Sequence, residues 1–203
     1  MMEKLKTYIL NTYNLLPAPI YGLLSAIAGI GGDIIGIALF PSYNFNYMIS
    51  ALGAGPGAIY FNIGTTLSGI FALLFYLYMI KAIGNEINDP KLQRAGRFFA
   101  INSCIFFSLI GVFPTSTNMT LFVLHGTFAL ISWLSAIIYL SIFSHLIFKN
   151  KIIPEFFGYL ALITAGTIIV FLLTWIPIIE WIMALGVTVW ITLPSVYMLY
   201  HKI

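Results

Sequence analysis

Charged side chains are scarce in this chain: Asp, Glu, Lys and Arg make up 7% of its 203 residues, whereas hydrophobic residues make up 61%. A soluble domain normally carries about a quarter charged residues. The chain therefore has too few charges to cover a water-facing surface, which excludes an ordinary soluble protein and indicates that lipid surrounds it. The net charge of +3 does not indicate nucleic-acid binding, and no nucleic-acid partner is expected.

Cysteine is almost absent as well. The one cysteine, Cys104, lies inside an apolar run, so an intrachain disulfide is impossible and the redox compartment stays undetermined. The N-terminal segment starts with basic residues, but Asn and Pro residues interrupt the stretch after them. It lacks the compact apolar region and the small-residue cleavage site of a signal peptide. The first apolar stretch is therefore expected to stay in the mature protein.

Long apolar stretches are what the chain has in abundance. A spanning helix needs about 20 mostly apolar residues, and the candidates are roughly 18–40, 57–81, 97–113, 119–148, 155–176 and 180–200. The third is short and the fourth is long. We predict an all-α fold in which residues 1–203 form one domain, an integral membrane bundle of six transmembrane helices. Residues 7–16 are predicted to lie at the interface, and residues 84–97 to form the one plainly solvated loop.

The basic residues fall only in alternate gaps between these stretches. Cytoplasmic loops of membrane proteins carry an excess of Lys and Arg, so the gaps that hold them are predicted to face the cytoplasm, with both termini inside. The nine basic residues are Lys4, Lys6, Lys81, Lys91, Arg94, Arg97, Lys149, Lys151 and Lys202.

Small residues recur every four positions in the first two stretches. Such stripes let helix backbones approach closely, which matters in lipid because the hydrophobic effect does not drive helices together there. We expect the two stripes to face each other within one helical hairpin, and a contact between two copies is the alternative. The stripes are Ala28, Gly32 and Gly36 in the first stretch and Gly64, Ser68 and Ala72 in the second.

Asp33 is the main anomaly, because a carboxylate near mid-membrane costs roughly 2.5–3.5 kcal/mol on insertion scales and should have a partner. At 1.5 Å per residue, Asp33 and His125 both lie about 10 Å from the outer ends of their helices. This shared depth predicts a hydrogen bond between them, with Asn62 near the same level. The arrangement predicts either an outward-facing polar pocket or a structural hydrogen bond that locks three helices together.

The segment 41–57, named the outer loop, is the second anomaly. It is too apolar for a solvated linker and too short to cross the membrane and return. An interfacial helix or a re-entrant flap is predicted, serving either as a lid over a cavity or as an inert plug. Gly53, Gly55 and Gly57 around Pro56 are predicted to form its hinge, since glycine leaves the backbone torsion φ free.

The sequence carries no recognisable catalytic or metal-binding motif. A catalytic zinc usually needs three protein ligands, and only His125 and Asp33 are expected near the same level; Glu180 could join them only if its helix end turned inward. His145 lies about 30 Å from His125 on a straight helix, so the pair cannot hold one haem iron. No catalytic residue, metal or cofactor is therefore predicted.

Short motifs in the outer half of the chain resemble a known family. They are Ile49-Ser50-Ala51-Leu52-Gly53 with Pro56, Phe61-Asn62, Gly111-Val112-Phe113-Pro114, and His125. Their order and spacing resemble a prokaryotic six-helix membrane family, domain of unknown function 998. The outline is also similar to that of the eukaryotic DRAM-like membrane proteins, which are associated with lipid remodelling. This resemblance implies a role in lipid handling. The residues that it singles out in this chain are Ser50, Gly53, Pro56, Asn62, Pro114 and His125.

Together these features predict a multi-pass protein of a prokaryotic plasma membrane that binds a lipid or another apolar ligand. Asp33, Asn62, His125 and Ser50 are the predicted ligand-binding residues, and membrane lipids are the predicted partners, with a second copy or another membrane protein as further candidates. One alternative is an intramembrane lipid-acting enzyme in which Asp33 orients His125 as acid or base. The other is a structural or accessory subunit of a membrane complex.

Overall fold

The computed structural model describes residues 16–84, 87 and 89–203. These residues form six long α-helices and one short 3-10 helix, without any strand. Each long helix is long and apolar enough to cross a membrane, so the predicted all-α, multi-pass membrane fold is confirmed. The elements are α2 (Ala18–Ala38), η1 (Ile49–Ala54), α3 (Ala58–Gly84), α4 (Pro90–Val112), α5 (Met119–Lys149), α6 (Phe156–Thr174) and α7 (Pro177–Tyr200).

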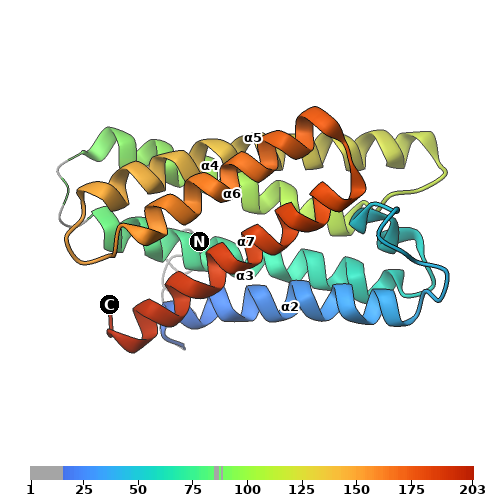
Figure 1. The fold of residues 1–203 in the computed structure, drawn as a ribbon, viewed down its shortest axis with the longest axis horizontal. Helices are drawn as coiled ribbons and strands as arrows, with labels where there is room; N and C mark the ends of the chain where they lie inside the picture. Colours follow the sequence, from blue (N-terminus) through green and yellow to red (C-terminus); the bar gives the residue numbers. More distant parts are fainter. Residues whose placement is uncertain (1–15, 85–86, 88) are drawn as a thin grey trace, which may run out of the picture.

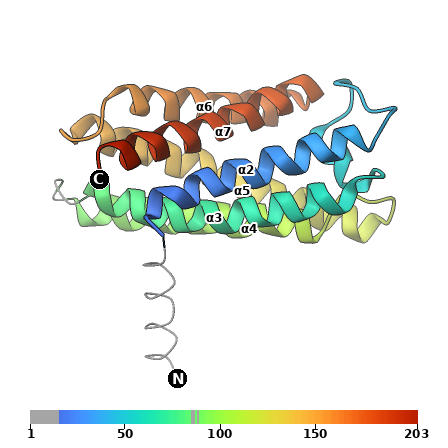
Figure 2. The same cartoon turned by 90° about the horizontal axis from the view of Figure 1, so that it is seen from below.

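The six helices form a closed ring. Each packs against its neighbours in the sequence, and α7 returns to pack against α2. Seen from below, α6 and α7 lie on one side and α3 and α4 on the other, with α2 and α5 between them (Figure 1, Figure 2). Short connections between antiparallel helices favour this arrangement. A ring of six helices leaves an axis through the bundle that side chains must either fill or line.

The third span is longer than predicted. Helix α4 begins at Pro90, where proline is favoured because the first helical N–H has no intrahelical partner. The Asp89 side chain accepts a hydrogen bond from the Leu92 backbone N–H at 3.0 Å and caps the helix. Residues 90–97, predicted as part of a solvated loop, are therefore the first two turns of α4. The segment predicted to be interfacial, 7–16, lies outside the described residues except for Leu16.

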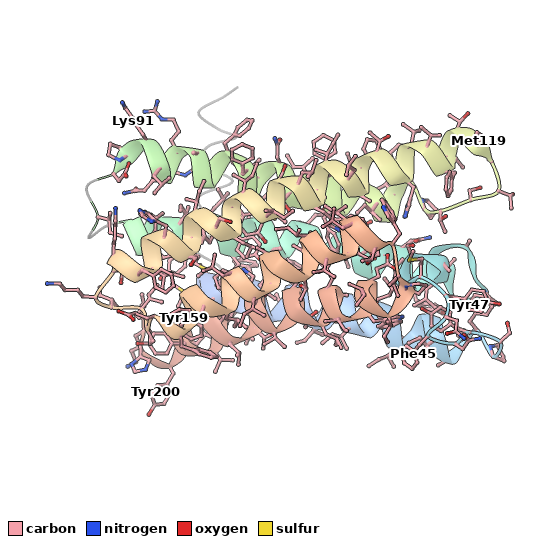
Figure 3. All side chains as sticks on the ribbon, turned by 45° about the horizontal axis from the view of Figure 1, so that its top comes forward. Phe45, Tyr47, Lys91, Met119, Tyr159 and Tyr200 are labelled. Atoms are coloured by element: carbon pink, nitrogen blue, oxygen red, sulfur yellow. The ribbon has the colours of Figure 1, made fainter. Side chains whose placement is uncertain are left out.

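The two ends of the bundle differ in charge. Lys91, Tyr159 and Tyr200 lie at the end that carries the C-terminus, and Phe45, Tyr47 and Met119 lie at the opposite end (Figure 3). The first is called the basic end, because every described Lys and Arg lies in the helix termini and connections there: Lys81, Lys91, Arg94, Arg97, Lys149, Lys151 and Lys202. The second is called the outer-loop end. That the basic end faces the cytoplasm stays a prediction from charge.

The small-residue stripes of α2 and α3 do face each other. A Cβ atom added at Gly64 would lie 2.6 Å from the Ala28 carbonyl oxygen and 2.9 Å from the Gly32 Cα. Nearer the basic end, the Ser25 hydroxyl donates to the Ser68 carbonyl oxygen at 2.9 Å. The predicted hairpin contact is confirmed, and it holds the two backbones closer than any larger side chain would permit.

Apolar side chains fill the bundle toward its basic end. The half of α3 and the half of α5 nearest that end contribute side chains that are almost completely buried: Phe75, Met79, Ile80, Ile83, Leu140, Phe143, Leu146 and Ile147. These side chains fill the axis of the ring on the basic side.

Candidate functional site

A cavity of about 150 Å³ occupies the ring above this apolar core. Its lining comes from η1 and all six long helices. Its polar lining includes the side chains of Asp33, Ser50, His125 and Glu180. Three of the four predicted ligand-binding residues therefore share one cavity, and their role in binding stays a prediction.

Asp33 belongs to α2, one turn before that helix ends at Ala38. Its side chain is half-buried and lines the cavity. The described part of the chain offers this carboxylate neither a hydrogen bond nor an ion pair. A carboxylate at membrane depth is costly without a partner, so Asp33 is the most conspicuous unsatisfied group of the site.

His125 has a different partner from the one predicted. Its Nδ1 atom lies 3.0 Å from the carbonyl oxygen of Phe113, the residue that ends α4. The last carbonyls of a helix have no intrahelical donor, and the turn from α4 into α5 brings one of them to the imidazole. The expected hydrogen bond to Asp33 is absent among the described residues, and that prediction was wrong about the partner although both side chains reach one cavity.

Glu180 also lines the cavity, and the sequence analysis did not include it among the predicted ligand-binding residues. It lies in the first turn of α7, and only 2% of its surface is exposed. Its Oε2 atom accepts a hydrogen bond from the Ile49 backbone N–H at 2.6 Å, and Ser50 also hydrogen-bonds to the carboxylate. Because Ile49 begins η1, the carboxylate caps that helix across 131 residues of chain. An acidic residue in the otherwise apolar stretch 180–200 was the signal available in the sequence.

The outer loop has one buried face and one exposed face. The segment forms the 3-10 helix η1 in place of a longer interfacial helix, and its Leu52 side chain is 0% exposed between α2 and α3. Phe45 and Tyr47, by contrast, are 59% and 50% exposed at the end of the bundle (Figure 3). Aromatic rings at such a position are typical of a membrane interface. One face of the loop therefore covers the ring while the other meets the surroundings.

A tyrosine and a tryptophan hold the rim of the loop against α7. The Trp181 indole N–H donates to the Tyr43 hydroxyl oxygen at 3.0 Å, and the Tyr43 hydroxyl donates to the Met48 carbonyl at 3.2 Å. Burial raises the pKa of the Tyr43 phenol to about 12, above its ordinary value of 10.0. The phenol therefore stays protonated at neutral pH and keeps its role as a donor.

The predicted hinge glycines are sites of close packing. No described glycine has a positive φ, and Gly55 adopts an extended conformation with φ −81°. An added Cβ atom would meet the Phe40 ring at Gly55, Asn62 Oδ1 at Gly53 and the Gly36 backbone at Gly57. The hinge was predicted because glycine can adopt a positive φ, but these glycines serve close packing and not an unusual backbone torsion. Movement about Gly53, Gly55, Pro56 and Gly57 stays a prediction.

Asn62 lies outside the cavity and supports the outer loop instead. Its Nδ2 donates to the Gly53 carbonyl oxygen at 3.2 Å, which ties α3 to the last turn of η1. Its Oδ1 is buried without a hydrogen-bond partner. The residue shares a separate shallow groove with Thr66 and Gly111 between α3 and α4. The structure thus separates Asn62 from Asp33 and His125.

Hydroxyl groups and aromatic rings line the deeper part of the cavity. Tyr76 and Tyr139, whose ring centroids lie 5.0 Å apart, mark its floor above the apolar core. The Ser132 hydroxyl donates a hydrogen bond to the Ser103 carbonyl oxygen at 2.9 Å. The Ser103 hydroxyl itself has no hydrogen-bond partner among the described residues, although that residue is only 6% exposed.

The described residues do not form a metal-binding site. Asp33, His125 and Glu180 line the same cavity, but no three His, Cys, Asp or Glu side chains of the described ranges form a group that could hold a metal ion. The acidic groups can accept hydrogen bonds from a polar ligand, and the imidazole can donate or accept one. The arrangement suits the recognition of a polar group at membrane depth.

The comparisons with known proteins identify the family. A family model described as "Protein of unknown function (DUF998)" matches residues 22–197, so the chain belongs to this family, as its motifs predicted. No curated protein and no solved structure matches the chain. The similarity to DRAM-like proteins and the prokaryotic origin stay predictions.

Proposed function

We propose that this membrane protein binds the polar end of an amphipathic molecule, such as a lipid, in the cavity of its helical ring. One observation carries the proposal: Asp33, His125 and Glu180 from three different helices line the same cavity as the apolar and aromatic side chains of the ring. Ligand sites are mostly apolar cavities with a few convergent polar groups. A purely structural hydrogen bond between helices would need no such space.

The size of the cavity limits what part of a ligand it holds. Pockets for drug-sized ligands measure about 300–1,000 Å³, whereas this cavity measures about 150 Å³. An engineered apolar cavity of about that size binds benzene. The site therefore accepts a head group and its first few carbon atoms, and the rest of an amphiphile must remain in the surrounding lipid.

The gap between α2 and α7 is the route that the geometry favours. Most cavity-lining residues of α3, α4 and α5 are buried, whereas α2 and α7 contribute half-exposed ones: Gly29, Asp33, Ala184, Val187 and Thr188. In Figure 1, α7 crosses α2 near the basic end, and the two diverge toward the outer-loop end. A tail can leave the cavity sideways between them. With the basic end in the cytoplasm, this opening faces the outer leaflet.

The filled inner half favours binding over transport. Transporter sites lie near the membrane midplane between helices that are broken there, but here the cavity ends on Tyr76 and Tyr139 above a filled apolar core. A ligand held on this floor has no observed path to the basic end. We therefore propose retention of a ligand as the activity of the fold.

Native mass spectrometry of protein extracted gently into lipid nanodiscs tests the proposal. Wild-type protein should retain an additional mass, and Asp33→Asn and His125→Ala should each lower its occupancy about tenfold, as expected for loss of about 1.4 kcal/mol of binding. His145→Ala is the matched control, because His145 is exposed and lies outside the cavity. A ligand-free wild-type mass, or equal retention by all variants, would contradict the proposal.

An intramembrane lipid-acting enzyme is the second candidate, because the His125 imidazole lines the cavity. When Nδ1–H donates to the Phe113 carbonyl, the Nε2 atom carries the free lone pair and can act as a base. This candidate predicts turnover of a lipid that His125→Ala abolishes while stability is retained. An accessory subunit, in contrast, would copurify with a partner protein and carry no ligand.

A further inference from the structure

Two acidic side chains line the cavity, and no described Lys or Arg does. Asp33 and Glu180 both line it, and every described Lys and Arg lies at the basic end, beyond the apolar core. His125 is committed through Nδ1 to a backbone carbonyl. The described residues therefore bring no Lys or Arg side chain to the two acidic groups. Acidic side chains inside membrane proteins usually have a partner, and a group that enters the cavity can supply one.

The two acidic side chains differ in how many hydrogen-bond partners they have. Glu180 is held against η1 by hydrogen bonds from Ile49 and Ser50, which fix the position of its side chain. Asp33 has no partner in the described residues, so its carboxyl group is free to bind a group that enters the cavity.

An independent feature shows that the cavity has unmet hydrogen-bonding capacity. The Ser103 hydroxyl lines it, has no partner in the described ranges and belongs to a residue that is 94% buried, since 6% is exposed. This group is on α4, on a different helix from either carboxylate, and its presence points to an occupant that offers or accepts a hydrogen bond.

We propose that the occupant is an amphiphile with a primary ammonium head, an inference that rests on the proposed function and names its ligand class. An ammonium group supplies one positive charge and three N–H donors. Its charge suits the two acidic side chains, and its donors suit the Asp33 oxygens. The Phe107 and Trp133 rings also line the cavity, and aromatic faces attract cations.

The same inventory disfavours an anionic head group. Phosphate recognition relies on Arg, Lys or backbone N–H groups, and no described Lys or Arg lies near the cavity. Two carboxylates facing a phosphate would repel it. A phospholipid with an amine head carries the required ammonium together with an unfavourable phosphate, so the simple alkylamine is expected to bind more tightly.

Binding of matched ten-carbon probes tests the inference. Decylamine, decanol and decanoate are titrated at pH 7 into wild-type protein in nanodiscs of phosphatidylcholine, with binding followed by displacement of the retained ligand in native mass spectrometry. Decylamine should bind at least tenfold more tightly than decanol, and decanoate least. Asp33→Asn should remove that preference, whereas Glu155→Gln, which changes an exposed residue at the basic end, should leave it intact. The measurement is repeated in nanodiscs that contain phosphatidylethanolamine. A retained phosphatidylethanolamine mass would identify a lipid head group as the source of the ammonium group, and its absence would point to a free amine.

The outcomes separate the two proposals. Equal binding of decylamine and decanol would overturn the ammonium inference and leave the proposed function standing. Tighter binding of decanoate would overturn it as well. Absence of binding by any probe, together with a ligand-free wild-type mass, would overturn both. Because the comparison of probes uses wild-type protein, the result does not depend on whether Asp33→Asn folds.

Discussion

Replacing Gly64 with alanine is expected to lower the free energy of unfolding by about 2–3 kcal/mol, the upper range for an overpacked interior. The single added methyl group would lie 2.6 Å from the Ala28 carbonyl oxygen and 2.9 Å from the Gly32 Cα. Both neighbours are backbone atoms, so no side-chain rotation can relieve the overlap. Helices α2 and α3 would have to separate along their whole contact. Thermal or denaturant unfolding in detergent measures the change.

The matched control for this change is Gly31→Ala. No atom lies within 4 Å of a Cβ added at Gly31, and alanine is favoured over glycine inside a helix by roughly 1 kcal/mol. This variant should therefore be as stable as wild type or slightly more stable. Equal destabilisation by both variants would show that α2 and α3 do not pack through Gly32 and Gly64.

Replacing Glu180 with alanine is expected to cost about 2–4 kcal/mol of stability. The change leaves the buried Ile49 N–H without its acceptor, which costs about 1–3 kcal/mol, and opens space where a 98% buried side chain stood, since Glu180 is 2% exposed. The effect should be local first: amide hydrogen exchange at Ile49 should rise more than exchange in α5. Exchange mass spectrometry and unfolding in detergent provide the two readouts.

Two further variants isolate the cause of that effect. Glu180→Gln keeps an acceptor oxygen for the Ile49 N–H and should cost less than the alanine variant. Glu155→Ala removes an exposed acid at the basic end and should change neither readout. If Glu180→Ala left exchange at Ile49 unchanged, the contact between α7 and η1 would not hold the outer loop.

The architecture could be predicted from the sequence because it depends on local composition. The six apolar stretches predicted the six helices, and the stripes through Gly32 and Gly64 predicted their own contact, since the spacing of small residues is a property of one helix at a time. The start of α4 was misplaced because Pro90 and Asp89 were taken as a turn. In the structure they begin a helix whose first turns carry the charges.

The candidate site could be predicted only in part, for a physical reason. Depth along a helix can be estimated by residue counting, and the similar depth expected for Asp33 and His125 agrees with the cavity that both side chains line. The direction of a side chain depends on rotation of each helix about its axis and on irregular connections. The end of α4 supplies the Phe113 carbonyl to His125, and the fold of η1 supplies the Ile49 N–H to Glu180. Neither partner belongs to a pattern that the sequence displays.

The most direct test of the central claim is photo-crosslinking from the bilayer. An alkylamine with a diazirine close to its head group is added to wild-type protein in nanodiscs, and the labelled residues are identified by peptide mass spectrometry. Labels should concentrate on cavity residues along the gap between α2 and α7, such as Gly29, Ala184 and Thr188, and excess unlabelled decylamine should reduce them. Labels spread evenly over exposed residues outside the cavity, such as Ile27 and Leu173, and unaffected by competitor would contradict a binding site inside the ring.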